Sequence, residues 1–164
     1  MADQRQKAYA IAAAVFVLDR ITKWLIETRV SLADTYRVIP GFFEIVNSQN
    51  RGVAFGILNN STSEWRTVAL VIASIAAVIV VSVMLWRAQR MDTLFLCGLS
   101  LILGGAAGNL LDRMVWGRVT DFLVFYIGQY EWPAFNVADS AIVIGSALLL
   151  LDQFRPKRQA ANVS

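Results

Sequence analysis

The chain has 164 residues, of which 57% are hydrophobic and 16% are charged, and its net charge is +3. Soluble domains average about 45–50% apolar and about 25% charged residues, so this composition argues against a soluble domain and predicts one integral membrane domain over residues 1–164. The basic residues are scattered, which argues against nucleic acid as a partner. The single cysteine excludes an intrachain disulfide, and the absence of histidine removes Ser-His and Cys-His nucleophiles.

Four hydrophobic stretches are each close to the roughly 20 residues that an α-helix needs to cross a bilayer. They cover residues 8–26, 67–86, 93–111 and 135–151. The sequence therefore predicts a mainly α-helical membrane protein with four transmembrane helices. With four crossings, seven basic residues beside the spans fall on one side, which should be the cytoplasmic side and should hold both termini. They are Arg5, Lys7, Arg87, Arg90, Arg155, Lys157 and Arg158. The connections 27–66 and 112–134 are then extracytoplasmic.

The first span carries charged residues in its outer half, where a charge costs about 2.5–3.5 kcal/mol on insertion scales. Asp19 and Lys23 are four residues apart and can form an ion pair on one helix face. These two residues could form a purely structural ion pair or belong to a functional site, and the sequence leaves both interpretations open.

The connection that follows contains two features, a turn and a glycine loop. Pro40-Gly41 lies between short β-prone runs, which predicts a small hairpin or curved sheet on the outer leaflet. The loop from Asn50 to Gly56 has glycines, including Gly52, that permit close approach of another chain. An ordinary turn is the alternative, because Asn and Gly dominate turns.

The outer end of the third span combines small and polar residues. Gly104 and Gly108 are four residues apart, so a neighbouring helix can approach this face closely. Asn109, Asp112 and Arg113 are three or four residues apart, which would aim an amide, a carboxylate and a guanidinium at one spot. For Asp112, charge pairing with Arg113 or another base is favoured over catalysis.

Two further aspartates lie near the fourth span. Asp121 interrupts an apolar, β-prone run where aspartate is disfavoured, so its presence needs a reason. Asp139 falls within the first turns of the last span, with Asn136 three residues earlier on the same face. A carboxylate near a helix N-terminus is favoured by the helix dipole, which is a purely structural explanation for Asp139.

Asp121 and Asp139 come from elements joined by a short loop, so they can converge at the outer end of the bundle. Two carboxylates that share a site do not both ionise readily, so one can activate water while the other polarises a carbonyl. This chemistry hydrolyses peptides without metal or histidine. The open alternatives are a Mg²⁺ or Ca²⁺ site built from aspartates, and a small transporter or ion-conducting subunit. The aspartates of that metal alternative are Asp19, Asp112, Asp121 and Asp139.

Five motifs occur in order along the chain and together closely resemble those of bacterial lipoprotein signal peptidase, also called signal peptidase II. They are Asp19-x-x-Thr22-Lys23, Asn50-x-Gly52-x-Ala54-Phe55, Gly104-Gly105-Ala106-x-Gly108-Asn109-Leu110-x-Asp112-Arg113, Val119-x-Asp121-Phe122 and Pro133-Ala134-Phe135-Asn136-x-Ala138-Asp139-Ser140. Each string is weak by itself, but five in sequence on a chain with four spans are highly specific.

The resemblance implies an aspartic peptidase of the bacterial inner membrane, with four transmembrane helices, an extracytoplasmic β-cradle and a periplasmic helix or loop. It implies that the substrates are diacylglyceryl-modified prolipoproteins, which are cut just before the lipidated cysteine. It implies sensitivity to globomycin and no metal or other cofactor, and we expect a monomer in contact with membrane lipid.

The motif match also assigns roles to individual residues. Asp121 and Asp139 match the catalytic aspartates. The positions that match residues lining or supporting the substrate site are Asn50, Gly52, Asn109, Arg113 and Asn136. Asp19, Lys23 and Asp112 match positions with a structural or supporting part.

Overall fold

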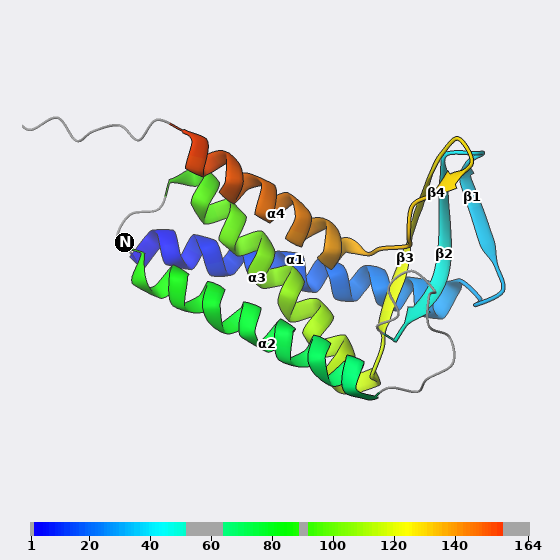
Figure 1. Ribbon diagram of the computed structural model, residues 1–164, viewed down its shortest axis with the longest axis horizontal. Coiled ribbons are helices and arrows are strands. Elements are labelled where there is room, and N and C mark those ends of the chain that lie inside the picture. Colours follow the sequence, from blue (N-terminus) through cyan, green and yellow to red (C-terminus); the bar gives the residue numbers. More distant parts are fainter. Residues whose placement is uncertain (1, 52–63, 89–91, 156–164) are drawn as a thin grey trace, which may run out of the picture.

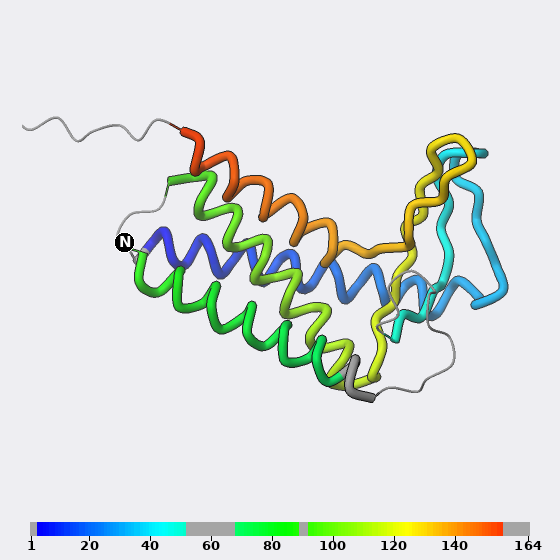
Figure 2. Tube along the Cα trace, viewed as in Figure 1, coloured from blue at the N-terminus to red at the C-terminus, as the bar shows by residue number. Residues whose placement is uncertain are grey.

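The computed structural model describes residues 2–51, 64–88 and 92–155, and within them four helices run alternately up and down (Figures 1 and 2). The helices are α1 (Ala2–Arg29), α2 (Glu64–Arg87), α3 (Thr93–Trp116) and α4 (Val137–Phe154). Figure 1 shows the first residues of α1 at one end of the bundle and a small sheet at the other. Each predicted span coincides with one of these helices.

Helix α3 is the centre of the bundle, because it packs against α1, α2 and α4. Its glycines make this possible, as the sequence predicts for Gly104 and Gly108. A Cβ at Gly104 would lie 2.5 Å from the Ala12 carbonyl oxygen of α1, and one at Gly108 would lie 2.5 Å from the Asp19 carboxylate. A Cβ at Gly105 would meet the carbonyl oxygen of Ala138 in α4. Small residues therefore let both neighbouring backbones approach α3 closely.

The outer surface of the bundle is apolar, as expected for contact with lipid. Helices α2, α3 and α4 are long and apolar enough to cross a membrane, and their spanning windows have mean hydropathies of 3.0, 1.9 and 1.6. Helix α1 does not meet this criterion, yet it exposes Val17, Ile21 and Trp24 and buries Asp19 and Lys23. The protein is thus a membrane protein, and the fourth span stays a prediction.

The sheet is antiparallel, has the order β1-β2-β3-β4, and stands at the end of the bundle (Figure 1). Its strands are β1 (Thr35–Ile39), β2 (Phe43–Asn50), β3 (Val119–Ile127) and β4 (Tyr130–Glu131). The predicted hairpin is confirmed: β1 and β2 pair around Pro40-Gly41, where Gly41 has a φ of 72°. Strand β3 pairs with β2 and thereby carries Asp121 to the end of the helices.

The ends of the helices differ from the ends of the predicted spans. Helix α3 continues five residues past 111 to Trp116 and ends at Gly117, whose φ of 64° places it in the left-handed region that commonly terminates helices. Helix α4 begins at Val137 rather than at residue 135. The expected periplasmic helix or loop of the 27–66 connection falls partly on residues 52–63, which lie outside the described part of the chain.

Candidate active site

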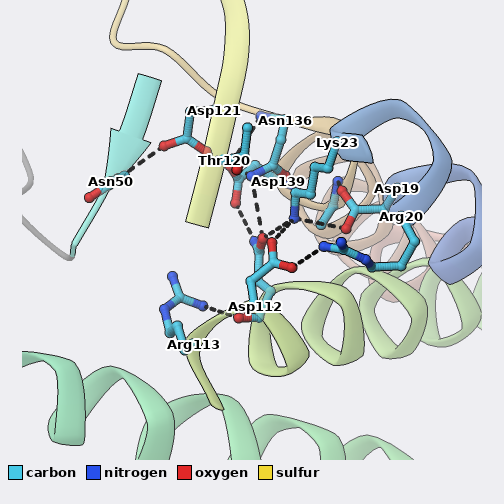
Figure 3. Close-up of polar contacts among 12 residues, drawn as sticks. Asp19, Arg20, Lys23, Asn50, Asp112, Arg113, Thr120, Asp121, Asn136 and Asp139 are labelled. Atoms are coloured by element: carbon cyan, nitrogen blue, oxygen red, sulfur yellow. Dashed lines mark hydrogen bonds and ion pairs between the residues drawn. The ribbon is translucent and has the colours of Figure 1, made fainter. Parts of the chain in front are cut away.

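The candidate site lies where β3 and β2 meet the ends of α3, α1 and α4 (Figure 3). Asp121 comes from β3 and is only 4% exposed. Asn50, the last residue of β2, donates a hydrogen bond of 3.0 Å from its Nδ2 to Asp121 Oδ2. The antiparallel pairing of β2 with β3 brings these two residues together, although 71 positions separate them in the sequence.

Asp139 is fixed by the start of α4. Asn136 is the N-cap, and its Oδ1 accepts a 2.9 Å hydrogen bond from the Asp139 backbone N–H. Asp139 Oδ2 in turn accepts from the Asn136 backbone N–H at 3.3 Å, so the two residues form a capping box. The prediction that Asn136 shares a helix face with Asp139 is therefore wrong: Asn136 is extended and lies before the first turn.

Two amide side chains connect the two aspartates. Asn136 Nδ2 donates to Asp121 Oδ1 at 2.7 Å, while Asn109 Nδ2 donates to Asp139 Oδ1 at 2.7 Å. Asn136 Nδ2 also donates to Asn109 Oδ1 at 3.3 Å, and this hydrogen bond links the two amides. The convergence of Asp121 and Asp139 inferred from the sequence is thus present as a hydrogen-bonded cluster, with Asn109 and Asn136 between the carboxylates.

The surroundings of Asp121 favour its protonated form. Burial raises the pKa of Asp121 to about 6, the hydrogen bond from Asn50 opposes this rise, and the negative charge of Asp139 adds to it. A carboxyl group with such a pKa exchanges its proton near neutral pH, which is where a general acid or base is most effective.

A cluster of buried charged side chains on α1 and α3 contacts the hydrogen-bonded cluster of the two aspartates through Asn109. Lys23 Nζ lies 2.8 Å from Asp19 and 2.6 Å from Asp112, and it donates to Asn109 Oδ1 at 2.9 Å. The predicted ion pair between Asp19 and Lys23 is therefore present. Asp19 Oδ1 also accepts a 3.0 Å hydrogen bond from the Ala138 N–H, which ties α1 to the first turn of α4.

Charge pairing of Asp112 is confirmed, with Lys23 and Arg20 as its partners rather than Arg113. The expectation that Asn109, Asp112 and Arg113 converge holds for the first two, which both contact Lys23. Arg113 does not contact Lys23 but donates to the backbone carbonyl of Asn109 at 3.2 Å and to Ser74 Oγ of α2 at 3.4 Å. Its charge also interacts with Asp139, Asp121 and Asp112. Gly52, the remaining predicted residue, lies outside the described part of the chain.

Comparisons with known proteins bear directly on this arrangement. Residues 11–155 match the family model described as signal peptidase (SPase) II. The chain belongs to the signal peptidase II family. It is 67% identical to a lipoprotein signal peptidase of Solibacter usitatus, with 100% of both chains covered, and 44% identical to one of Nitratidesulfovibrio vulgaris, covering 93% and 92%. The family assignment gives no support to the transporter alternative.

The fold agrees with solved structures as well. A structure described as a bacterial membrane enzyme, determined at 2.3 Å resolution, superposes with a TM-score of 0.78 at 32% identity, covering 94% of this chain and 93% of that one. A second, at 1.9 Å resolution, gives 0.79 at 31% identity, covering 92% and 94%. This member of the signal peptidase II family therefore shares its helices and sheet with experimentally determined membrane enzymes.

Sequence reasoning missed two contacts of this signal peptidase II site. Thr120, beside Asp121, donates a 2.6 Å hydrogen bond to Glu27 and so holds β3 against α1. Arg20 pairs with Asp112. A lone threonine in a strand carries no signal, but a third charge in one apolar span could have drawn attention to Arg20.

The metal alternative meets a difficulty in the described residues, where no three His, Cys, Asp or Glu side chains are grouped as ligands. Of the four aspartates considered for it, Asp19 and Asp112 are engaged by Lys23.

Proposed function

We propose that this chain is an aspartic endopeptidase whose catalytic pair is Asp121 and Asp139. As a member of the signal peptidase II family, it cleaves signal peptides from prolipoproteins. The proposed substrates carry diacylglyceryl on the lipobox cysteine, and the bond cut lies just before that cysteine. The observation that carries the proposal is the hydrogen-bonded cluster in which Asn136 and Asn109 connect the two carboxylates.

The proposed reaction needs one ionised and one protonated aspartate. The ionised carboxylate takes a proton from water, and the resulting hydroxide attacks the scissile carbonyl carbon. The protonated carboxyl group gives its proton to the carbonyl oxygen, so that no free oxyanion forms. As the tetrahedral intermediate collapses and its C–N bond breaks, the carboxyl group that took the water proton gives it to the amide nitrogen, which leaves as an amine. The other carboxylate takes back a hydroxyl proton from the intermediate, so the products are a carboxylic acid and an amine and the pair again holds one proton. The raised pKa of Asp121 supports a shared proton at this site.

Neutral amides suit this chemistry, because they orient carboxylates without fixing their charge. Asn50, Asn109 and Asn136 all donate to an aspartate oxygen and can follow either protonation state of the pair. We assign Arg113 and Gly52 to substrate binding, on the motif match. Asp19, Lys23 and Asp112 support the amides from within the bundle.

We further propose four transmembrane helices in one domain over residues 1–164, lying in the bacterial inner membrane. The apolar surface of α1 supports its inclusion, since its buried charges face the protein rather than lipid. Both termini would be cytoplasmic and the site periplasmic. The basic residues near the bundle end opposite the sheet support this orientation, among them Arg5, Lys7, Arg87 and Arg155.

The same proposal covers the partners. A periplasmic site at the end of a bundle reaches a scissile bond that a lipid anchor holds near the bilayer surface, while surrounding protein shields its polar backbone. Exposed apolar residues of β1, such as Tyr36 and Val38, support contact with membrane lipid. We also propose that the enzyme acts as a monomer and is inhibited by globomycin-type peptides, as the motif resemblance implies.

The decisive experiment replaces each aspartate. Asp121→Asn and Asp139→Asn should each lower turnover of a purified diacylated prolipoprotein by at least about 1000-fold, because one half of the acid–base pair is lost. Both variants should still insert in the membrane. Asp34→Asn, which changes an exposed acid in the loop after α1, is the matched control and should keep full activity. Substantial turnover in either site variant would reject the proposed pair.

A further inference from the structure

Arg20 lies in the outer half of α1, where it joins α1 to α3. Its guanidinium group forms an ion pair with Asp112 and lies over the Trp116 ring, 4.5 Å from the ring centroid (Figure 3 shows the ion pair). The side chain is 19% exposed, whereas that of Asp112 is 3% exposed. Two independent contacts therefore hold one partly buried cation against one buried acid.

We propose that Arg20 is a positioning residue that sets the electrostatic potential at the proposed catalytic pair. It does so by neutralising Asp112 and by holding the chain of contacts that runs from Asp112 through Lys23 and Asn109 to Asp139. This inference deepens the proposed function and rests on it.

The buried cluster consists of two acids, Asp19 and Asp112, and two bases, Arg20 and Lys23. Lys23 alone faces two acids, since Asp19 and Asp112 both lie within 2.8 Å of its Nζ. Without Arg20 the cluster would hold two negative charges against one positive charge. An unbalanced charge inside a protein acts over a long range, because the effective dielectric constant there is well below that of water. Arg20 supplies the second cation and makes the cluster neutral.

The geometry of the contacts carries the second step. Asp112 accepts from Arg20 through Oδ1 and pairs with Lys23 through Oδ2. Lys23 then donates to Asn109 Oδ1, and this orients the Asn109 amide so that its Nδ2 donates to Asp139. Each link fixes the next, so Arg20 acts on Asp139 through three intermediate side chains without touching substrate.

Other charged groups surround the same site and have to be considered. From α1 come Asp19, Lys23 and Glu27, the last joined to Thr120 beside Asp121. Helix α3 supplies Asp112 and Arg113, while β3 and α4 supply the two aspartates of the proposed pair. Strand β2 contributes the neutral Asn50. Arg20 differs from Lys23 and Asp19 because its contacts are with Asp112 and Trp116, whereas Lys23 donates to Asn109 and Asp19 accepts from the first turn of α4. Its removal therefore changes the charge of the cluster without removing a hydrogen bond to a group next to the proposed pair.

The sign of the expected effect follows from the charge left behind. Arg20→Gln leaves the cluster with a net charge of −1, which stabilises the protonated forms of nearby carboxyl groups. Both the acidic and the basic limb of the pH profile of kcat/KM should therefore move to higher pH, by roughly half to one unit. KM measured at the new optimum should stay unchanged. A role limited to packing would lower the whole profile without moving its limbs.

Three variants complete the test on the full-length enzyme with a diacylated prolipoprotein as substrate. Arg20→Lys keeps the charge and should restore the wild-type limbs. Arg29→Gln removes a cation from the exposed last turn of α1 and, as the matched control, should move neither limb. Asp112→Asn leaves the cluster with a net charge of +1 and should move both limbs to lower pH, even if its rate is reduced.

Unshifted limbs in Arg20→Gln or in Asp112→Asn would overturn the inference, as would a shift in Arg20→Lys equal to that in Arg20→Gln. These outcomes differ from a failure of the proposed function, which would appear as turnover in Asp121→Asn or Asp139→Asn. If Arg20→Gln does not insert in the membrane, Asp112→Asn tests the inference alone: limbs that move to lower pH support it, and unshifted limbs overturn it.

Discussion

At the scale of single residues, the amide of Asn109 keeps Lys23 out of direct contact with Asp139. Asn109 stands between the fully buried Lys23 and Asp139, accepting from Lys23 at 2.9 Å and donating to Asp139 at 2.7 Å. An ammonium group in direct contact with a carboxylate stabilises the ionised form and opposes the sharing of a proton. The intervening amide transmits orientation and weakens the charge effect, which suits a pair that has to share one proton.

The amide of Asn50 gives a prediction for the pH dependence. Burial raises the pKa of Asp121 to about 6, and the hydrogen bond from Asn50, which stabilises the ionised carboxylate, keeps it from rising further. In Asn50→Ala the pKa of Asp121 should rise further, because the donor to the charged form is lost. The acidic limb of the kcat/KM profile should then move to higher pH by roughly one unit, measured with a diacylated prolipoprotein over pH 4–9.

Ser48→Ala is a suitable control for Asn50→Ala. Ser48 is the β2 residue directly opposite Asp121 in the register, and in the described part of the chain no hydrogen bond joins their side chains. Its acidic limb should coincide with that of the wild type. An unmoved limb in Asn50→Ala would show that Asn50 does not stabilise the ionised carboxylate in the working enzyme.

Individual residues were predictable from the sequence to different degrees. Asp121 stood out because an acid in an apolar strand is costly, and Lys23 because it lies one helical turn after Asp19. The contact between Arg20 and Asp112 was not predictable, since it depends on how α1 is rotated against α3. A periodic pattern shows which residues share a face, but it does not show which side chain on the next helix they meet.

At the scale of elements, the N-terminus of α4 combines helix capping with the organisation of the site. Asn136 uses its Oδ1 to cap α4 and its Nδ2 to bind Asp121, so one side chain serves both purposes. The two functions can be separated by serine, which is also a good N-cap but has no amide group to replace the Nδ2 donor to Asp121.

Two substitutions of Asn136 test this separation. Asn136→Ala loses the cap and should lower the free energy of unfolding by about 0.5–2 kcal/mol. Asn136→Ser should regain most of that loss, measured as the thermal unfolding midpoint in detergent. Neither variant should recover the wild-type kcat, because alanine has no polar atom, and the one hydroxyl oxygen of serine cannot occupy the positions of both Oδ1 and Nδ2 of Asn136. A serine variant that is as active as the wild type would show that the Asn136 amide is dispensable for catalysis.

The boundaries of the elements show where local signals were sufficient. Pro40-Gly41 predicted the hairpin correctly, since a glycine with positive φ between β-prone runs fixes a turn locally. The end of α3 was misplaced because hydropathy falls at Asp112, whereas the helix continues until Gly117. Buried ion pairs allow charged residues to extend a helix beyond its apolar stretch, so hydropathy alone underestimates its length.

At the scale of the whole molecule, charged side chains are buried and many large apolar side chains are exposed, which is the reverse of the usual arrangement in a soluble protein. Buried positions hold Asp19, Lys23, Asn109 and Asp112, while many large apolar side chains of α1, α2 and α4 are exposed. A lipid environment explains both observations, because it favours apolar groups outside and requires charged groups to pair within the bundle. The membrane class was therefore predictable from composition, and the positions of the four helices of the described residues from the hydrophobic stretches, whereas the pairing of the internal charges was not.

The proposed orientation leads to a labelling prediction. In a Cys97→Ala background, cysteines placed at Ser31 and Gln129 should react with a membrane-impermeant thiol reagent added from the periplasmic side. A cysteine placed at Gln153 should react only after the inner membrane is opened. All three positions are exposed, so differences in reactivity report on the side of the membrane. The opposite labelling pattern would reverse the proposed topology.

The ion pair between α1 and α3 also bears on how the polypeptide is made. Asp19 and Lys23 pair within one helix, so they can leave the translocon together as a neutral couple. Arg20 finds its acid 92 positions later, in a helix that is synthesised after α1 and α2. If α1 spans the membrane as proposed, we therefore expect its insertion to be completed only after the third helix has been synthesised and has supplied Asp112.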